Sequence, residues 1–196
     1  MNGRRILGVD PGLRTTGYGV IELRDGGLRL VEGGVLQPNP NAPLERRLVQ
    51  LHDGMVEVVR ATRPDCMVVE ELWTAYEHPQ TAVLMGHARG VLALVAGANA
   101  LVVHDLAHAM VKRALVGSGS ASKAQVKGMV VQLLGLASPP QPDDVSDALA
   151  LAIAFANVEA QRNHFAELGV VMPQRRSRAT TLLLRAPSGN RAKSQS

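Results

Sequence analysis

Short blocks of apolar residues separated by polar turns make up the first 36 residues. An apolar run at residues 5–9 ends at Asp10, and a second apolar stretch follows a Pro-Gly turn at residues 18–23. The Asp-Gly-Gly sequence at residues 25–27 is typical of a hairpin, and a third stretch then runs to about Leu36. This pattern predicts that the chain opens with three antiparallel strands.

From Leu44 onward, strand and helix patterns alternate. Apolar residues recur every three or four positions over Leu44–Thr62, which predicts a helix. Short, fully apolar runs predict strands at residues 66–69 and 101–103, whereas longer segments predict helices over residues 81–98, 107–115, 123–134 and 144–162. This order favours an α/β fold, with a five-stranded mixed sheet and helices on both of its faces.

Length and composition suit one domain followed by a tail. The chain has 196 residues, of which 46% are hydrophobic but only 3% aromatic, so the core must consist mainly of Ala, Val and Leu. The periodic pattern fails beyond Gly169. We therefore expect a domain over residues 1–165 and a basic, disordered tail over residues 166–196.

The net charge of +4 is concentrated near the C-terminus. Residues 174–196 contain six basic residues and no acidic ones, which leaves the preceding residues slightly negative. A basic tail favours polyanions such as nucleic acid, although many basic tails are merely solvated. With one cysteine, Cys66, and no continuous apolar stretch of membrane-spanning length, we expect a cytoplasmic protein without a disulfide framework.

Four acidic residues lie at the ends of predicted elements. Asp10 closes the first strand and Glu70 the fourth, while Asp144 and Asp147 lie three residues apart near the start of the last helix. Residues with this spacing share one face of a helix. One sheet could thus bring four carboxylates together, and clustered carboxylates are the ligands that Mg²⁺ or Mn²⁺ requires.

Each of these acids also has a purely structural interpretation. Asp10 could form an Asx turn before Pro-Gly, and Glu70 could make a salt bridge at a strand end. Asp143 and Asp144 suit the first turn of a helix, where acids complement the helix dipole. Asp147 fits that interpretation less well, because it follows the first turn within an apolar stretch.

Five segments, in order, resemble the RuvC family of bacterial Holliday-junction resolvases. They are "ILGVDPGLRTTGYGVI" (residues 6–21), "VVEELW" (68–73), "GHARGV" (86–91), "VKRALVGSGSASKAQV" (111–126) and "DDVSDALALAI" (143–153). The resemblance implies a ribonuclease-H-like fold and a homodimer. It also implies Mg²⁺-dependent, paired symmetric nicking of four-way DNA junctions in recombination and repair, beside the RuvA–RuvB branch-migration complex.

The resemblance also implies the site residues. Its catalytic and metal-binding acids fall on Asp10, Glu70, Asp144 and Asp147, which would hold two Mg²⁺ ions, with Mn²⁺ as a substitute. Asp143 lies four residues from Asp147 and could compete with Asp144 on geometry alone. The action on DNA implies a cytoplasmic enzyme that is associated with the nucleoid while acting.

Aromatic and basic residues are the candidates for DNA contacts. The family has an aromatic residue at Trp73, which favours base stacking over a role as a cap on the core, and Tyr76 could assist. Lys112 and Lys123 match basic positions of the family's DNA-facing surface, whereas Lys127 is interpreted as a solvated lysine beside a flexible "GSGSAS" loop.

Other basic and small residues have less specific interpretations. No DNA contact is assigned to Arg14 or Arg89, and no catalytic role is assigned to the six histidines, which show no metal-ligand spacing. Gly86 and Gly90 would let another helix approach closely, either within the monomer or at the family's dimer interface.

Two other classes of function remain open on the sequence. Sugar kinases and actin-like ATPases also have an Asp-x-Gly-x-x-Thr hairpin, but they pair two such domains, and this chain contains no repeat. A junction-binding protein without catalysis is the second alternative, and the presence of all four acids argues against it.

Overall fold

A computed structural model describes residues 3–24, 27–71 and 79–169, which form five strands and five helices. The strands are β1 (Arg4–Asp10), β2 (Thr16–Arg24), β3 (Gly27–Leu36), β4 (Cys66–Glu70) and β5 (Val102–Leu106). The helices are α1 (Leu44–Thr62), α2 (Pro79–Ala98), α3 (His108–Val116), α4 (Lys123–Leu134) and α5 (Asp143–Glu167).

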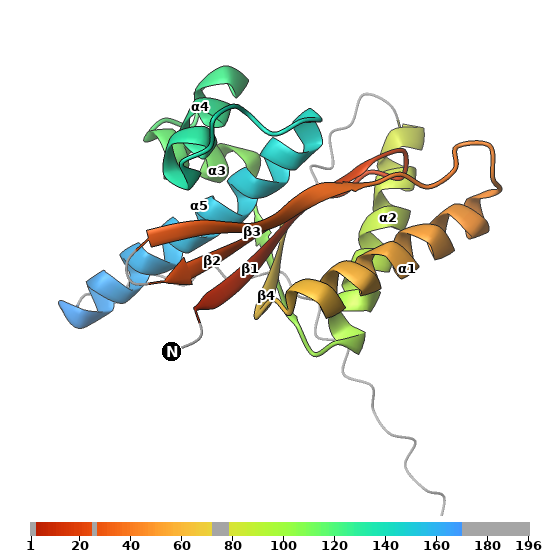
Figure 1. Cartoon of the computed structure of the whole chain (residues 1–196), viewed down its shortest axis with the longest axis horizontal. Helices are drawn as coiled ribbons and strands as arrows, with labels where there is room; N and C mark the ends of the chain where they lie inside the picture. Colours follow the sequence, from red (N-terminus) through yellow and green to blue (C-terminus); the bar gives the residue numbers. More distant parts are fainter. Residues whose placement is uncertain (1–2, 25–26, 72–78, 170–196) are drawn as a thin grey trace, which may run out of the picture.

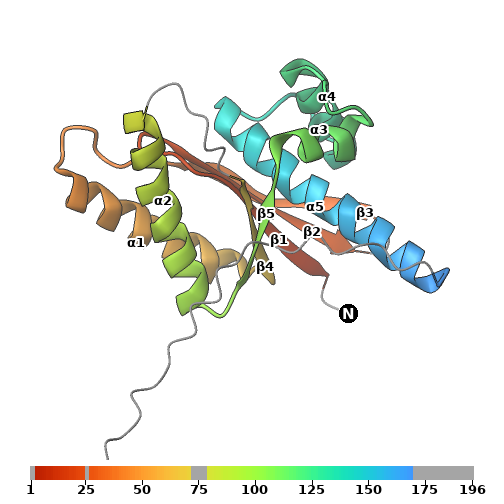
Figure 2. The same ribbon diagram turned by 180° about the vertical axis from the view of Figure 1, so that it is seen from behind.

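The strands form one mixed sheet in the order β3-β2-β1-β4-β5. The pairs β1–β2 and β2–β3 are antiparallel, whereas β1–β4 and β4–β5 are parallel. Two layers of helices cover the sheet, with α5, α3 and α4 on one face and α1 and α2 on the other (Figures 1 and 2). The predicted α/β architecture is confirmed.

Alternate residues of β1 supply the two cores. Ile6 packs with α5, α3 and α4, whereas Leu7 and Val9 pack with α1 and α2, as expected for a strand that is covered on both faces. The core is rich in Ala, Val and Leu, as the composition predicts. Because β1 is central and buried, its last residue, Asp10, has a fixed position at the C-terminal end of this strand.

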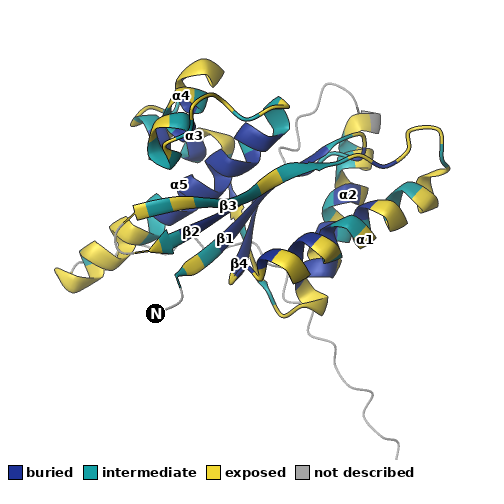
Figure 3. Ribbon diagram, viewed as in Figure 1, coloured by how far each residue is buried: buried dark blue, intermediate teal, exposed yellow. Residues whose placement is uncertain are grey.

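Several element boundaries differ from the prediction. The α1 and α4 helices have the predicted bounds, but β5 continues to Leu106 and α5 to Glu167. The extra turns of α5 project past the sheet and are mostly exposed, so they lack the apolar period on which the prediction relied (Figure 3). The expected tail lies almost entirely outside the described residues, so the division at residue 165 remains a prediction.

The sequence pattern predicts no apolar stretch of membrane-spanning length, but part of α2 has that length and composition. Thr81–Ala98 is long and apolar enough to cross a membrane by length and composition, with a mean hydropathy of 1.4, and 22% of it is buried. Its inner side packs on the sheet through Ala88, Leu92 and Val95. Its outer side exposes apolar residues, including Val83 and Leu94.

Candidate active site

Asp10 ends β1 and pairs with Gly17 of β2 across the hairpin. The turn between them is closed by buried Thr16, whose hydroxyl donates to the carbonyl oxygen of Gly12 over 2.6 Å. In the described part of the chain, the Asp10 carboxylate forms no ion pair and no hydrogen bond. The Asx-turn interpretation is therefore wrong, because Thr16 stabilises the turn and leaves the Asp10 carboxylate available.

Glu70 ends β4, the parallel neighbour of β1. It therefore lies at the same end of the sheet's strands as Asp10. Its Oε1 atom lies 2.8 Å from Nδ1 of His108, the first residue of α3. The Glu70 side chain is 31% exposed and that of His108 is 61% exposed. The salt bridge expected for a strand-end glutamate is thus present only when the histidine is protonated.

The position of α5 over the sheet is set by glycines in β1 and β2. A Cβ atom at Gly8 would lie 2.0 Å from the carbonyl oxygen of Ala148, and one at Gly17 would lie 2.1 Å from that of Asp144. The backbone of α5 therefore rests directly on these strands. Because Gly17 pairs with Asp10, this seat places the first turns of α5 beside the Asp10 carboxylate.

Three of the predicted acids line one pocket of about 150 Å³. Asp10, Glu70 and Asp147 face it, together with His108, Lys112 and Lys123. Asp147 is the one residue between positions 145 and 156 that is not buried. Asp144 does not line this pocket, but its charge acts on Asp10.

The electrostatics of the pocket centre on Asp10. Burial is the largest of the effects that together raise the pKa of Asp10 to about 7; the charges of Glu70, Asp147 and Asp144 also raise it, whereas Lys123 lowers it. A carboxylate in this position is poorly stabilised by the surrounding protein. A bound cation would relieve both the burial and the repulsion between the acids.

Two lysines of α4 contact the acids at the start of α5. Lys123 Nζ lies 2.9 Å from Asp147 Oδ2 and 3.4 Å from Asp143 Oδ2, and Lys127 also pairs with Asp143. These lysines hold the pKa of Asp143 below its usual range. The Lys127 side chain is only 19% exposed, so the interpretation of Lys127 as a solvated lysine is wrong.

The contacts of Asp143 and Asp144 separate these two neighbours. Asp143 is engaged by lysines, whereas the backbone of Asp144 lies against Gly17, next to Asp10. Ser122 is the N-cap of α4 and forms a capping box with Gln125, so the helix begins at Lys123. The "GSGSAS" segment thus ends in a defined helix cap.

The donor set suits a hard divalent cation, since it consists of carboxylate oxygens around a shared pocket. Within the described residues, no group of three or more His, Cys, Asp or Glu side chains has the spacing of a metal site. The carboxylates of Glu70 and Asp147 are turned instead toward His108 and Lys123. The residues present therefore fit a metal in chemistry, with two of the candidate ligands contacted by His108 and Lys123.

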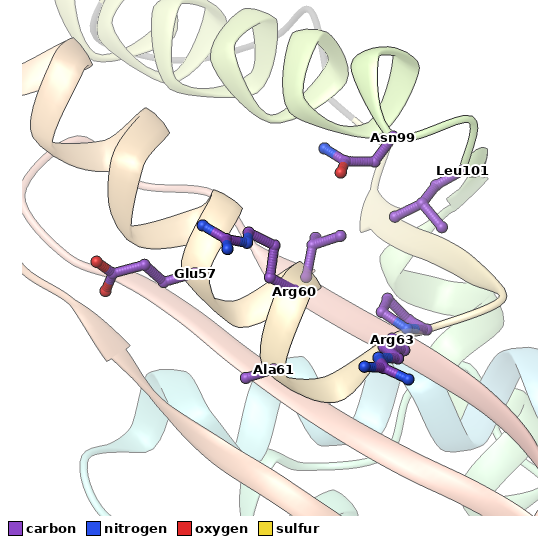
Figure 4. A pocket seen from close by; sticks show the side chains of 8 residues that line it. Glu57, Arg60, Ala61, Arg63, Asn99 and Leu101 are labelled. Carbon is purple, nitrogen blue, oxygen red and sulfur yellow. The ribbon is translucent and has the colours of Figure 1, made fainter.

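A second, more open hollow of about 730 Å³ lies between the C-terminal ends of α1 and α2 (Figure 4). Its lining includes Glu57, Arg60, Arg63 and Asn99. It contains none of the four predicted acids, and only one carboxylate, that of Glu57, lines it. The larger hollow therefore lies away from the predicted acids.

The remaining predicted residues have different outcomes. Trp73 and Tyr76 lie outside the described residues. Lys112 lines the acidic pocket and forms no ion pair with any described residue. Gly86 and Gly90 face open space, so the interpretation that they pack against a helix of the same monomer is wrong.

His108 was missed by the sequence reasoning, which assigned no role to any histidine. It lines the acidic pocket and contacts Glu70, which lies 38 positions earlier in the chain. Metal-ligand spacing could not reveal this contact, because the topology brings the two residues together. The available signal was the position of His108 just after β5, the parallel neighbour of β4.

Comparison with known proteins identifies the family. The family model described as "Crossover junction endodeoxyribonuclease RuvC" matches residues 6–155. The chain belongs to the RuvC family. The protein is therefore a crossover junction endodeoxyribonuclease, a divalent-metal-dependent enzyme that hydrolyses phosphodiester bonds, and the ATPase and inactive-scaffold alternatives are set aside.

Relatives and solved structures agree with this assignment. The RuvC of Desulforamulus reducens is 45% identical over 152 residues, covering 77% of this chain and 92% of the relative. The structure of Thermus thermophilus RuvC matches with a TM-score of 0.73 and 31% identity over 87% of this chain and 99% of that one. The same RuvC in complex with a Holliday junction substrate matches with a TM-score of 0.72 and 29% identity, with the same coverage. The ribonuclease-H-like fold is confirmed.

Proposed function

We propose that this RuvC family member resolves four-way DNA junctions by paired, symmetric nicks, and that Asp10, Glu70, Asp144 and Asp147 form its catalytic site. The observation that carries the proposal is the poorly compensated Asp10 carboxylate, whose pKa is raised to about 7 by burial and by the charges of the other three acids. Such an arrangement disfavours the ionised site unless cations bind there.

The four acids are proposed to hold two Mg²⁺ ions, for which Mn²⁺ can substitute. When bound, such a pair supplies an activated water and stabilises the leaving oxygen of the phosphodiester. The protein contributes the fixed position of Asp10 on the central strand and the seat of α5 on Gly8 and Gly17. Asp143 is proposed to lie outside the ligand set, because Lys127 and Lys123 engage it.

Basic and aromatic residues are proposed to hold the DNA. Lys112 lines the acidic pocket without an ion-pair partner among the described residues, so its ammonium is available to a phosphate at the site. Lys123 lines the same pocket and its side chain is 54% exposed. Trp73 and Tyr76 are proposed to stack on unpaired bases, and the basic tail is proposed to add nonspecific affinity.

The enzyme is proposed to act as a homodimer through α2. This helix exposes Val83, Leu84 and Leu94. A Cβ atom added at any of its three glycines would have no atom within 4 Å apart from those of adjoining residues in the helix. An exposed apolar face of this kind is typical of a surface that another protein covers. A dimer with a two-fold axis would present two sites to a junction of matching symmetry.

The proposed setting follows from the substrate. Junction DNA places the enzyme in the cytoplasm, at the nucleoid while it acts, where the family resemblance pairs it with the RuvA–RuvB complex.

A cleavage assay tests the proposed function. A synthetic four-way junction and a linear duplex of the same sequence are incubated with the protein and with Mg²⁺, Mn²⁺ or a chelator. We expect paired nicks in the junction with either metal, and none in the duplex or with chelator. Equal cutting of junction and duplex would contradict the proposed selectivity, and cutting in chelator would contradict the metal site.

A further inference from the structure

Arg89 connects α2 to the strand ends that carry the proposed site. It lies on the face of the sheet opposite to α5, and its guanidinium reaches the C-terminal ends of β4 and β5. Its Nη1 donates to the backbone carbonyl oxygen of Glu70 over 2.5 Å, and its Nη2 donates to the Asp105 carboxylate. The Arg89 side chain is 21% exposed and its contact with the Glu70 carbonyl is partly buried, whereas its contact with Asp105, a 47% exposed side chain, is open to water.

The Glu70 carbonyl needs a donor at this point. The β1–β4 ladder ends at the pair Val9–Val69, one residue before Glu70. On the other side, the Glu71 amide continues the β4–β5 pairing by donating to Leu106 over 2.9 Å. Arg89 supplies the hydrogen bond that the ladder to β1 no longer provides, and its loss would leave a partly buried carbonyl oxygen without its donor.

We propose that Arg89 is a positioning residue for Glu70, and that Asp105 orients the Arg89 guanidinium for this role. The inference rests on the proposed function, in which Glu70 is a metal ligand. The contact of Glu70 with His108 is exposed, so it constrains the carboxylate weakly. The hydrogen bond from Arg89 to the Glu70 carbonyl therefore constrains the position of the Glu70 backbone, and with it the side chain, more firmly than His108 does.

An arginine is required by the geometry. The planar guanidinium donates from two nitrogens to two acceptors on different strands, whereas a lysine ammonium is a point charge that would satisfy one of them less well. Both donating nitrogens of Arg89 are occupied by protein acceptors. Its removal should therefore weaken metal binding without weakening the attraction of the protein for DNA.

The test compares Arg89→Met and Arg89→Lys with Arg60→Met, a control arginine on α1 beside the second hollow. Three quantities are measured: the rise in Tm that Mn²⁺ causes without DNA, the half-saturating Mg²⁺ concentration for junction cutting, and the metal-free Kd for the junction. We expect Arg89→Met to raise the half-saturating Mg²⁺ about tenfold and to reduce the Mn²⁺ effect on Tm. The junction Kd should stay within about twofold, Arg89→Lys should be intermediate, and Arg60→Met should match wild type.

Glu70→Gln, measured in parallel, separates this inference from the proposed function. If Glu70→Gln loses cutting and the Mn²⁺ effect while Arg89→Met keeps the wild-type metal response, Arg89 is not a positioning residue and the proposed site stands. If Glu70→Gln cuts like wild type, the proposed site itself is wrong. A fall in Tm and in junction binding with an unchanged half-saturating Mg²⁺ would reduce Arg89 to general support of the fold.

Asp105→Asn provides a second route if Arg89→Met does not fold. This substitution keeps an acceptor for Arg89 but removes the charge, so we expect a smaller shift of about two- to threefold in half-saturating Mg²⁺. An unchanged value for this variant would overturn the inference.

Discussion

Two long apolar helices, α5 and α2, lie on opposite faces of one sheet and are buried to very different degrees (Figure 3). In α5, every residue from Val145 to Ala156 except Asp147 is buried. In α2, the buried apolar residues of the described part are Ala88, Leu92, Val95 and Ala96. Apolar composition alone therefore does not decide burial, since what lies against each helix decides it.

Glycines show the same contrast. Those beneath α5, in β1 and β2, remove side chains so that the helix backbone reaches the sheet. Those within α2 (Gly86, Gly90 and Gly97) face open space. The first set shapes the proposed metal site, whereas the second set suits the close approach of another molecule.

The largest effect is expected from adding a side chain at a glycine on which the backbone of α5 packs. Gly17→Ala would place a methyl group 2.1 Å from the carbonyl oxygen of Asp144, and a backbone atom cannot move aside cheaply. We expect a loss of about 1–3 kcal/mol in the free energy of unfolding, measured by urea titration. Junction cutting should fall at least about a hundredfold, because a shift of about 1 Å in the proposed catalytic acids suffices for such a loss.

Gly128→Ala is the matched control, because a Cβ atom at this α4 position meets nothing within 4 Å. It should stabilise the protein by about 0.5–1 kcal/mol through helix propensity and leave cutting unchanged. Equal stability and equal junction cutting in the two variants would contradict the role assigned to Gly17 in positioning α5.

The next effect concerns the exposed face of α2. Leu94 is 63% exposed in the single chain, so Leu94→Asp should fold normally but place a charge in the proposed subunit interface. We expect the dimer Kd from sedimentation to rise at least about tenfold. Val49→Asp, on exposed α1, should leave the dimer intact, and an unchanged dimer in Leu94→Asp would assign the apolar face of α2 another role.

A smaller effect is expected on the stability of the metal-free protein. The pKa of Asp10 is raised by folding to about 7, so the folded state keeps a proton that the unfolded state loses above about pH 4. Wild-type stability should therefore fall as pH rises from about 4 to 7 because of this group.

Asp10→Asn removes that penalty. At pH 8 without metal, the variant should be more stable than wild type by roughly 1–3 kcal/mol, and at pH 4 the difference should vanish. Thermal unfolding in chelator at both pH values measures this. A variant that is less stable than wild type at pH 8 would show that the Asp10 carboxylate has a stabilising partner.

The smallest effect is expected at the start of α5. Lys127→Met removes the partly buried lysine that pairs with Asp143 while keeping a side chain of similar length. We expect a loss of less than about 1 kcal/mol in the free energy of unfolding and an unchanged half-saturating Mg²⁺ concentration. A marked change in that concentration would place Asp143 among the metal ligands.

Much of the fold follows from local patterns. The bounds of α1 and α4 follow from apolar periodicity and from turn residues, and the strand pattern gives the mixed sheet. The end of α5 could not be predicted, because its last turns project into solvent and carry no apolar stripe.

The sequence predicts the acids of the proposed site but not their contacts. Asp10 and Glu70 end neighbouring strands, so their convergence follows from the parallel pairing of β1 and β4. The contacts of His108 and Arg89 join residues 38 and 19 positions away from Glu70, and only tertiary packing fixes them. The alternating glycines of β2 were visible in the sequence, but their role depends on which helix covers them.

Asp10 is proposed to serve cutting and not DNA binding. The most direct test measures cutting and binding of the same four-way junction by wild type and Asp10→Asn, with Mg²⁺ for cutting and without metal for binding. We expect Asp10→Asn to bind within about threefold of wild type, because it removes no basic contact, but to produce no detectable nicks. Cutting by Asp10→Asn at the wild-type rate would contradict it.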